Sequence, residues 1–567
     1  MQSGELSCSP SSDQAYDFVR ARLRDCDVNH PGCKSDSAEL PTRMIDVGGF
    51  DDYVRLVETS SLPQSSSINY IALSYCWGIG QSVTTVSSNY EEFTTKGISV
   101  STLPPTLRDA VTVARELGQR YIWIDALCII QDSSSDWELE AARMASVYQN
   151  AYLTISAGTA AAAAEGFLEG RQHMAAREKN VYTTEWSASD NTNVETTLAA
   201  RIIPSSVNHW KYMVNHGLPL NTRGWTMQEK ILSRRVITYS THELQWTCLS
   251  LNTCECGYLL DSNKRGHNTI SINPDLSRRE ASYQWAKIIA EYSSRCLTYV
   301  EDKLPAISGV AHALQPIFRS AYLAGHWVDN LPEELAWKAM PPHPEYNPPS
   351  SSLSSSSSET TKQYIAPTFS WASIRGGSVE CVYLNHDIER RWTSCCVVSG
   401  FHSEVKGQNP LGRISDASIT LRGYLLGGQL TIKKFHGFYT VESVTLPGEK
   451  KVHFFMDTFL EELSFVGPDG TKERSVRRSP THLSLPGPKT ERGIDCPVYL
   501  FLLGYWIGEG NDDEMESKPE PDMAFLVLGR APNQVGKWER VGFGRCQRQL
   551  RGRVSWQVRV RKRERRG

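Results

Sequence analysis

The stretch that decides the fold is YIWIDALCII, at residues 121–130. Nine of its ten side chains are apolar or aromatic, and Asp125 is the exception. Such a run is expected of a parallel strand that is covered on both faces. Two shorter runs of the same kind are YIALSY, at residues 70–75, and YLTISA, at residues 152–157. We therefore predict three buried strands of one sheet.

Helical spacing separates these three runs. Thr106–Leu117 carries its apolar residues on one face and is followed by Gly118, which suits the end of a helix. Ser135–Tyr148 has a second apolar stripe. The order strand, helix, strand, helix, strand favours parallel strands with right-handed crossovers. Ligands bind such sheets beyond the carboxyl ends of the strands, so we expect a site there.

Capping-box spacing, a hydroxyl residue three positions before an acidic or amide residue, marks the start of many helices. It occurs three times near the predicted helices. The pairs are Thr106 with Asp109, Ser135 with Glu138, and Thr226 with Glu229.

The remaining chain divides by composition and periodicity. Residues 280–340 show helical spacing, a proline-rich and serine-rich stretch follows, and short alternating runs dominate the end. The predicted segments are an N-terminal extension at 1–67, an α/β domain at 68–250, a helical segment at 251–340, a linker at 341–363 and a β-rich domain at 364–567.

Composition excludes several classes of protein. A net charge of −3 argues against an electrostatic nucleic-acid binder, and no run of 18 apolar residues could span a membrane. Residues 1–14 lack a signal-peptide pattern, so we expect a cytoplasmic protein. Its 14 cysteines are then expected to be reduced thiols.

Several ordered motifs resemble the fungal heterokaryon incompatibility (HET) domain family. Within the α/β region they are YIALSYCWG at 70–78, LPPT at 103–106 followed by DA at 109–110, WIDALCIIQD at 123–132, and LNTRGWTMQE at 220–229. Segments that resemble the regions flanking the domain are YSSRCLT at 292–298, DKLPAISG at 302–309 and SWAS at 370–373. Together these motifs extend over some 300 residues, which is far more specific than any single match.

The resemblance implies a fungal effector of vegetative incompatibility, whose activation kills fused cells that differ genetically. HET domains have been likened to TIR domains, so the resemblance implies a TIR/flavodoxin-like parallel sheet. Some TIR domains cleave NAD, and others only assemble signalling complexes. Two hypotheses follow: an enzyme with NAD as its substrate and no certain cofactor, or a non-catalytic module that self-associates or binds an incompatibility partner.

Glu140 and Asp125 are the candidate catalytic residues. A carboxylate beside the ribose could stabilise the oxocarbenium-like state through which the nicotinamide–ribose bond breaks. Glu140 borders the apolar stripe of its helix, and its spacing from Trp137 resembles that of catalytic TIR domains. Its alternative is a surface or salt-bridged glutamate. Asp125 lies inside an apolar run, where it either contacts a ligand or caps neighbouring amides.

Six more residues are candidate nucleotide contacts. Trp77 could stack on a ring but is more often a core residue. Arg223 could grip a phosphate. Cys128 lies in an apolar run, which predicts a raised pKa and an inert thiol. The full set is Ser74, Trp77, Gly78, Cys128, Arg223 and Glu229.

Cys26, His30 and Cys33 form the pattern C-x3-H-x2-C, which could be part of a zinc site. A fourth ligand is missing nearby, although Cys8 could reach, and unligated thiols in a loop are the alternative. Cys248, Cys254 and Cys256 form another group, with no histidine close by. We therefore predict no metal site. Residues 551–567 carry eight basic residues and one acidic residue, as expected of a solvated tail, a nuclear signal, a patch that binds anionic surfaces or, in part, an edge strand.

Overall fold

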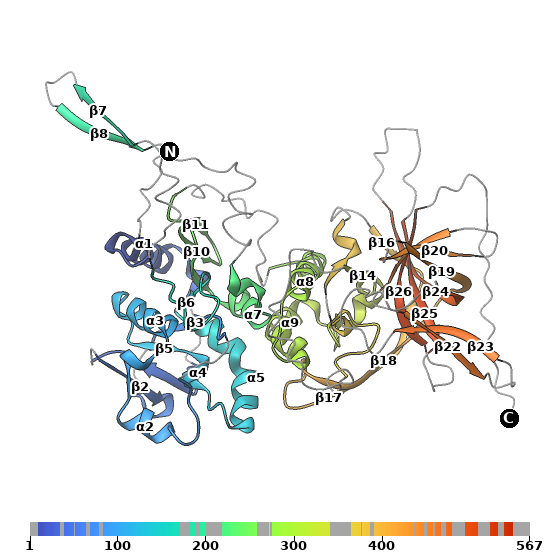
Figure 1. Ribbon diagram of the computed structural model, residues 1–567, viewed down its shortest axis with the longest axis horizontal. Helices are drawn as coiled ribbons and strands as arrows, with labels where there is room; N and C mark the ends of the chain where they lie inside the picture. Colours follow the sequence, from blue (N-terminus) through green and yellow to red (C-terminus); the bar gives the residue numbers. More distant parts are fainter. Residues whose placement is uncertain are drawn as a thin grey trace. The chain divides into compact units, whose positions relative to one another are not determined.

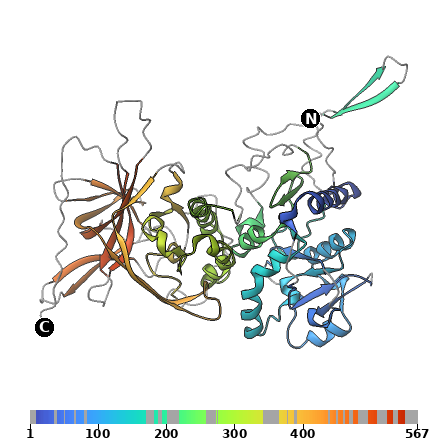
Figure 2. The same cartoon turned by 180° about the vertical axis from the view of Figure 1, so that it is seen from behind.

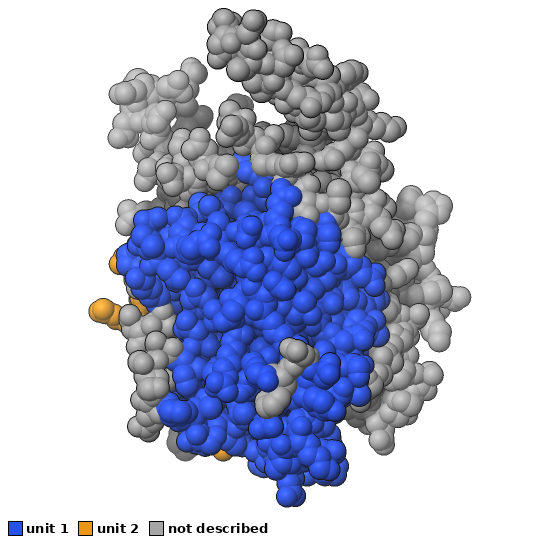
Figure 3. Space-filling model, turned by 90° about the vertical axis from the view of Figure 1, so that its left-hand side faces the viewer, with its two compact units in different colours: residues 1–271 blue, residues 272–567 orange. Residues whose placement is uncertain are grey.

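The structure is a computed structural model of the whole chain. The residues it describes are 9–34, 39–49, 52–63, 68–78, 83–169, 181–187, 193–199, 218–257, 272, 275–340, 364–375, 377–385, 391–435, 438–446, 451–456, 460–466, 472–478, 494–507, 522–530 and 538–547. The predicted linker, Cys8 and the basic tail lie outside them. The chain divides into two compact units, residues 1–271 and 272–567 (Figure 3).

A nine-stranded mixed sheet forms the centre of the first unit, in the order β11-β10-β9-β6-β3-β5-β1-β2-β4 (Figure 1). Its strands are β1 (Arg43–Asp46), β2 (Tyr53–Glu58), β3 (Tyr70–Ser74), β4 (Ile98–Ser99), β5 (Tyr121–Trp123), β6 (Leu153–Ser156), β9 (Arg235–Tyr239), β10 (Leu244–Cys248) and β11 (Asn252–Cys254). The neighbours β5, β3, β6 and β9 pair in parallel, which confirms the prediction for the three apolar runs. The outer strands pair antiparallel.

Helices cover both faces of this sheet. The helices α1 (Asp13–Asn29) and α3 (Pro105–Glu116) lie on one face, and α5 (Ser134–Asn150) and α7 (Trp225–Leu232) lie on the other (Figures 1 and 2). The short helices α2 (Tyr90–Thr95) and α4 (Asp125–Cys128) complete the described set of this unit, with the hairpin β7 (Val181–Ser187) and β8 (Asn193–Ala199). Because the central strands are covered twice, every residue of β3 and β5 is buried.

The prediction that residues 121–130 form one strand is wrong. The strand β5 ends at Trp123, and Asp125 begins α4, a single helical turn. Both parts are buried, so an apolar run by itself does not distinguish them. The polar exception in the run therefore marks the point at which the chain leaves the sheet.

The predicted capping boxes are also wrong. The helix α5 begins after Ser133, whose hydroxyl accepts a hydrogen bond from the Asp136 amide. The helices α3 and α7 have no side-chain cap at their starts. Gly118, by contrast, has φ +68° and follows Leu117, the C-cap of α3, as predicted for a helix end.

The second unit combines helices with β-structure, and its C-terminal part is β-rich, as predicted. The helices α8 (Arg278–Ser293), α9 (Pro305–Phe318) and α10 (Leu331–Glu334) pack around tryptophans, three of which are Trp285, Trp327 and Trp371. A seven-stranded antiparallel sheet follows, in the order β16-β24-β19-β20-β21-β26-β25. Because β24 also pairs with β25, six of these strands close into a barrel.

The strands of the second unit differ in length, and their described pairings are antiparallel. They are β12 (Tyr322–Leu323), β13 (His326–Trp327), β14 (Trp337–Met340), β15 (Ser378–Cys381), β16 (Arg391–Ser394), β17 (Val397–Val405), β18 (Ile414–Arg422), β19 (Leu425–Phe435), β20 (Phe438–Thr445), β21 (Lys451–Met456), β22 (Leu460–Val466), β23 (Lys472–Arg478), β24 (Ile494–Ile507), β25 (Asp522–Arg530) and β26 (Trp538–Gln547). None of the helices in the described part of the chain has the length and apolar character that a membrane crossing requires.

Candidate functional site

Polar side chains gather where the parallel strands of the first unit end. We call Ser74, Trp77, Asp125, Arg223 and Glu229 the strand-end cluster. Ser74 is the last residue of β3, Asp125 follows β5, and Glu229 comes from α7. The crossovers bring Ser74 and Asp125 to the carboxyl edge of one sheet, where the sequence placed them, and α7 adds Glu229, for which the sequence predicted no position.

Asp125 is held by its neighbours on both oxygens. The indole nitrogen of Trp77 donates to Oδ2 at 2.8 Å, and the Ala126 amide donates to Oδ1 at 2.7 Å. Burial raises the pKa of Asp125, while the Trp77 hydrogen bond and the charge of Arg223 act to lower it. The residue as a whole is half-buried, and desolvation has the largest effect on its carboxyl group.

Glu229 is the second carboxyl group of the cluster. It is 6% exposed, and burial raises its pKa from 4.5 to about 7. The negative charge of Asp125 acts in the same direction. Hydrogen bonds with Ser74 and Tyr148 and the charge of Arg223 oppose the rise. A carboxyl group with a pKa near 7 can both accept and release a proton under cellular conditions.

Arg223 is the cation of the cluster. Its Nη1 donates to the Tyr75 carbonyl at 2.9 Å, which fixes the guanidinium beside the end of β3. Part of its surface is exposed, so the group can face a solute as well as the two carboxyl groups. A guanidinium in such a position is suited to phosphate.

A small cavity adjoins the cluster. It is lined by polar groups of the strand ends and of α7, and it has room for about one water molecule. Its lining residues are Ser74, Thr154, Ser156, Leu220, Asn221, Thr226, Lys230 and Val236. Ser74 lines this cavity and also interacts with Glu229, which does not itself line it.

Gly78 and Cys128 have structural explanations. Gly78 has φ +74°, and a Cβ atom there would lie 2.3 Å from the Cβ of Ala162, so the close approach of two loops requires glycine. The Cys128 thiol is fully buried, and burial raises its pKa to about 12, as the apolar run predicted. Neither residue contributes a reactive group to the cluster.

Glu140 lies in a separate group of charges. It is 1% exposed and faces Arg43 of β1, whose Nη2 is 3.9 Å from Oε1. Burial raises the pKa of Glu140, while interaction with the Thr42 side chain and the charges of Arg43 and Arg143 act to lower it. Arg43 is bound more closely by Asp136, at 2.6 Å, and by the Cys128 carbonyl, at 2.8 Å.

The sequence missed two members of these arrangements. Arg43 belongs to the predicted N-terminal extension, and only the pairing of β1 with β5 brings it to Glu140. Tyr148 was assigned to an apolar stripe, yet its hydroxyl donates to the Leu73 carbonyl at 2.9 Å and contacts Glu229. No local pattern signals either contact.

The comparisons with known proteins agree with these motifs. The family model described as Heterokaryon incompatibility protein (HET) matches residues 70–229. The chain contains a HET domain. Neither the curated proteins nor the solved structures yield a match. The HET match begins with β3 and ends at Glu229, so every member of the strand-end cluster lies within it.

Proposed function

We propose that this protein is a cytoplasmic effector of fungal non-self recognition and programmed cell death, and that its HET domain hydrolyses NAD at the strand-end cluster. The observation that carries the proposal is Glu229, a buried carboxyl group with a pKa near 7. It shares the carboxyl edge of parallel strands with Asp125 and Arg223. Perturbed carboxyl groups at such an edge are typical of functional sites.

Strand order supports the comparison with TIR domains. Counted along the chain, the parallel strands β3, β5, β6 and β9 are first to fourth, and their spatial order is second, first, third, fourth. Flavodoxin-like sheets begin with the same order. Fold alone does not imply chemistry, so the proposal rests on the residues at the edge.

Each charged residue of the strand-end cluster has a separate role in the proposed reaction. Arg223 binds the pyrophosphate, and the carboxylate of Asp125 faces the positive charge that develops on the ribose. Water adds to C1′ of the ribose as the bond to the nicotinamide nitrogen breaks. Nicotinamide leaves as a neutral molecule with the electron pair of that bond, and the proton of the water passes to Glu229. The products are ADP-ribose and nicotinamide.

Glu140 is the second candidate carboxylate for this chemistry. Its buried carboxyl group and raised pKa support such a role, although it lies 3.9 Å from the guanidinium of Arg43 and interacts with Thr42. If Glu140 instead only balances Arg43, its removal alters folding and leaves the reaction intact. The two carboxyl groups can therefore be separated by substitution.

The test is to express the full chain in a heterologous host and follow growth together with cellular NAD. We compare the wild type with Asp125→Asn, Glu140→Ala and Glu138→Ala. Glu138 is the matched control because it is an exposed glutamate two residues before Glu140 on the same helix. We expect growth arrest with NAD loss in the wild type and in Glu138→Ala, and neither effect in Asp125→Asn.

The same experiment identifies the alternative. Growth arrest without NAD loss, unchanged by Asp125→Asn and by Glu140→Ala, would contradict hydrolysis. It would favour a non-catalytic module that recruits a death partner or self-associates. Loss of activity in Glu140→Ala alone, at wild-type protein levels, would move the catalytic carboxylate from Asp125 to Glu140.

A further inference from the structure

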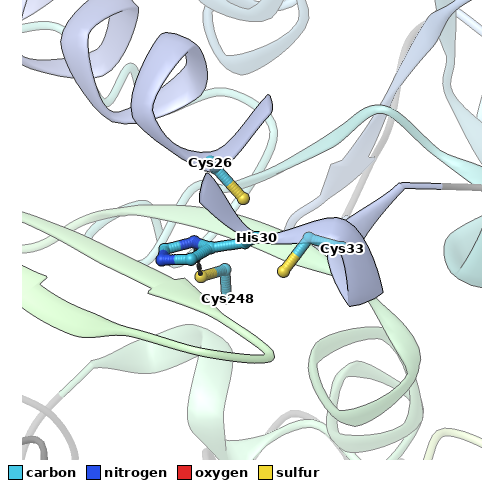
Figure 4. Close-up of side chains that lie close together, drawn as sticks. All are labelled: Cys26, His30, Cys33 and Cys248. Atoms are coloured by element: carbon cyan, nitrogen blue, oxygen red, sulfur yellow. Dashed lines mark hydrogen bonds between the residues drawn. The ribbon is translucent and has the colours of Figure 1, made fainter. Parts of the chain in front are cut away.

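Four side chains with metal-binding atoms converge at one end of the first unit. Cys26 lies near the end of α1, His30 follows that helix, Cys33 ends the 3-10 turn η1 (Pro31–Cys33), and Cys248 ends β10 (Figure 4). Their three sulfurs and one imidazole nitrogen all lie within 4.8 Å of one another. Residues more than 200 positions apart thus form one compact group.

The spacing of these atoms suits a tetrahedral ion. With Zn–S near 2.3 Å and Zn–N near 2.0–2.1 Å, two ligand atoms of a tetrahedral zinc site are roughly 3.5–3.8 Å apart. The observed distance between the Cys248 sulfur and Nδ1 of His30 is 3.5 Å. Cysteine and histidine are also the ligand types that zinc prefers.

The fold supplies the ligand that local spacing lacked. The sequence grouped Cys248 with Cys254 and Cys256, but β10 and β11 carry them to different places. Cys254 and Cys256 lie 3.1 Å apart, next to Glu243, while Cys248 joins His30. The fourth position is therefore filled from β10 without the need for Cys8.

Neighbouring groups fix the ligands in place. Nε of Arg235 donates to the Cys26 sulfur at 3.2 Å, and Arg235 also pairs with Asp27 at 2.7 Å. The Leu251 amide donates to the Cys248 sulfur at 3.2 Å. Hydrogen bonds of this kind orient the residues that coordinate a metal directly and tune their affinity for it.

We propose that Cys26, His30, Cys33 and Cys248 bind one Zn²⁺ ion and so attach α1 to β10. Four protein ligands leave no open position, which is the pattern of a structural site rather than a catalytic one. Three thiolates and one Zn²⁺ carry a net charge of −1, which the guanidinium of Arg235 offsets. The site is independent of the proposed reaction at the strand-end cluster.

The first test is the metal content of the purified full chain, measured by elemental analysis. We expect about one zinc per chain in the wild type, loss of that zinc in Cys248→Ser, and retention in Cys254→Ser. Cys254 is the matched control because it is buried, lies on the next strand and belongs to the neighbouring cysteine group. Retention in Cys248→Ser, or loss in Cys254→Ser alone, would overturn the proposal.

A second measurement covers the case in which Cys248→Ser does not fold. Wild-type protein reconstituted with Co²⁺ should show thiolate-to-cobalt charge-transfer absorption and tetrahedral d–d bands. Under denaturing conditions with a chelator, all 14 cysteines should react with a thiol reagent. A count of 12, which is 14 minus 2, together with no bound metal would show a disulfide in place of the zinc site.

Discussion

The sheet of the HET domain and the closed sheet of the second unit both bury charged groups, but they treat them differently. In the closed sheet, Arg540 donates to the carbonyls of Leu335 and Trp337 and stacks on the Trp337 ring, 3.4 Å from its centroid. Asp522 is paired with Arg545.

At the carboxyl edge of the parallel strands, by contrast, two carboxyl groups face each other. Burial raises the pKa of both Asp125 and Glu229. The comparison teaches that a buried charge with a full set of fixed partners stabilises a fold. Buried carboxyl groups with displaced pKa values at the end of a parallel sheet are candidates for the chemistry proposed above.

The largest expected effect is on the closed sheet. Arg540→Ala should lower the free energy of unfolding by about 3–5 kcal/mol, because it removes two hydrogen bonds from a charged group to backbone carbonyls together with the ring contact. Denaturant titration of the full chain measures the loss. Arg540→Met, which keeps part of the packing, should lose less. If Arg540→Ala costs nothing, its partners do not stabilise the fold and the comparison fails.

The second effect is the pH dependence of the free energy of unfolding that Glu229 causes. The pKa of Glu229 is about 7 in the folded state and 4.5 for an ordinary glutamate, which stands for the unfolded state. Between these two pH values the folded state therefore binds a proton that the unfolded state has lost. Its contribution to stability is present below pH 4.5 and is lost as pH rises through 7. The loss amounts to about 3 kcal/mol at most. Glu229→Gln should therefore gain stability relative to the wild type at pH 8 compared with pH 5.

The control for this pH dependence is Glu138→Gln, which changes an exposed glutamate of α5. Its stability difference from the wild type should not change between pH 5 and pH 8. An equally flat difference for Glu229→Gln would mean that Glu229 has no displaced pKa. The cluster would then lose the property that separates it from the closed sheet.

The smallest of these effects concerns the loop beside the cluster. Gly78→Ala should cost about 1–3 kcal/mol, because it imposes a positive φ on alanine and drives its Cβ into Ala162. Gly118→Ala is the matched control: its φ is also positive, but a Cβ there meets nothing within 4 Å. Thermal unfolding compares the two variants. Equal losses would assign the whole cost to the backbone and none to the contact with Ala162.

The parallel core was predictable because YIALSY, YIWIDALCII and YLTISA contribute strands that are covered on both faces, so their sequences are mostly apolar. The end of β5 was not, since the run continues into α4 and burial gives both parts the same composition. Glu140 was expected to border a buried face and does, but its partner Arg43 comes from a strand almost 100 residues earlier. Contacts of that range follow from strand pairing and leave no trace in local spacing.

The most direct test of the central claim is a structure of the full chain determined with NAD. The account predicts nucleotide density at the carboxyl ends of β3 and β5, with the ribose beside Asp125 and the pyrophosphate beside Arg223. Nucleotide bound elsewhere on the chain, with the strand-end cluster unchanged, would contradict it.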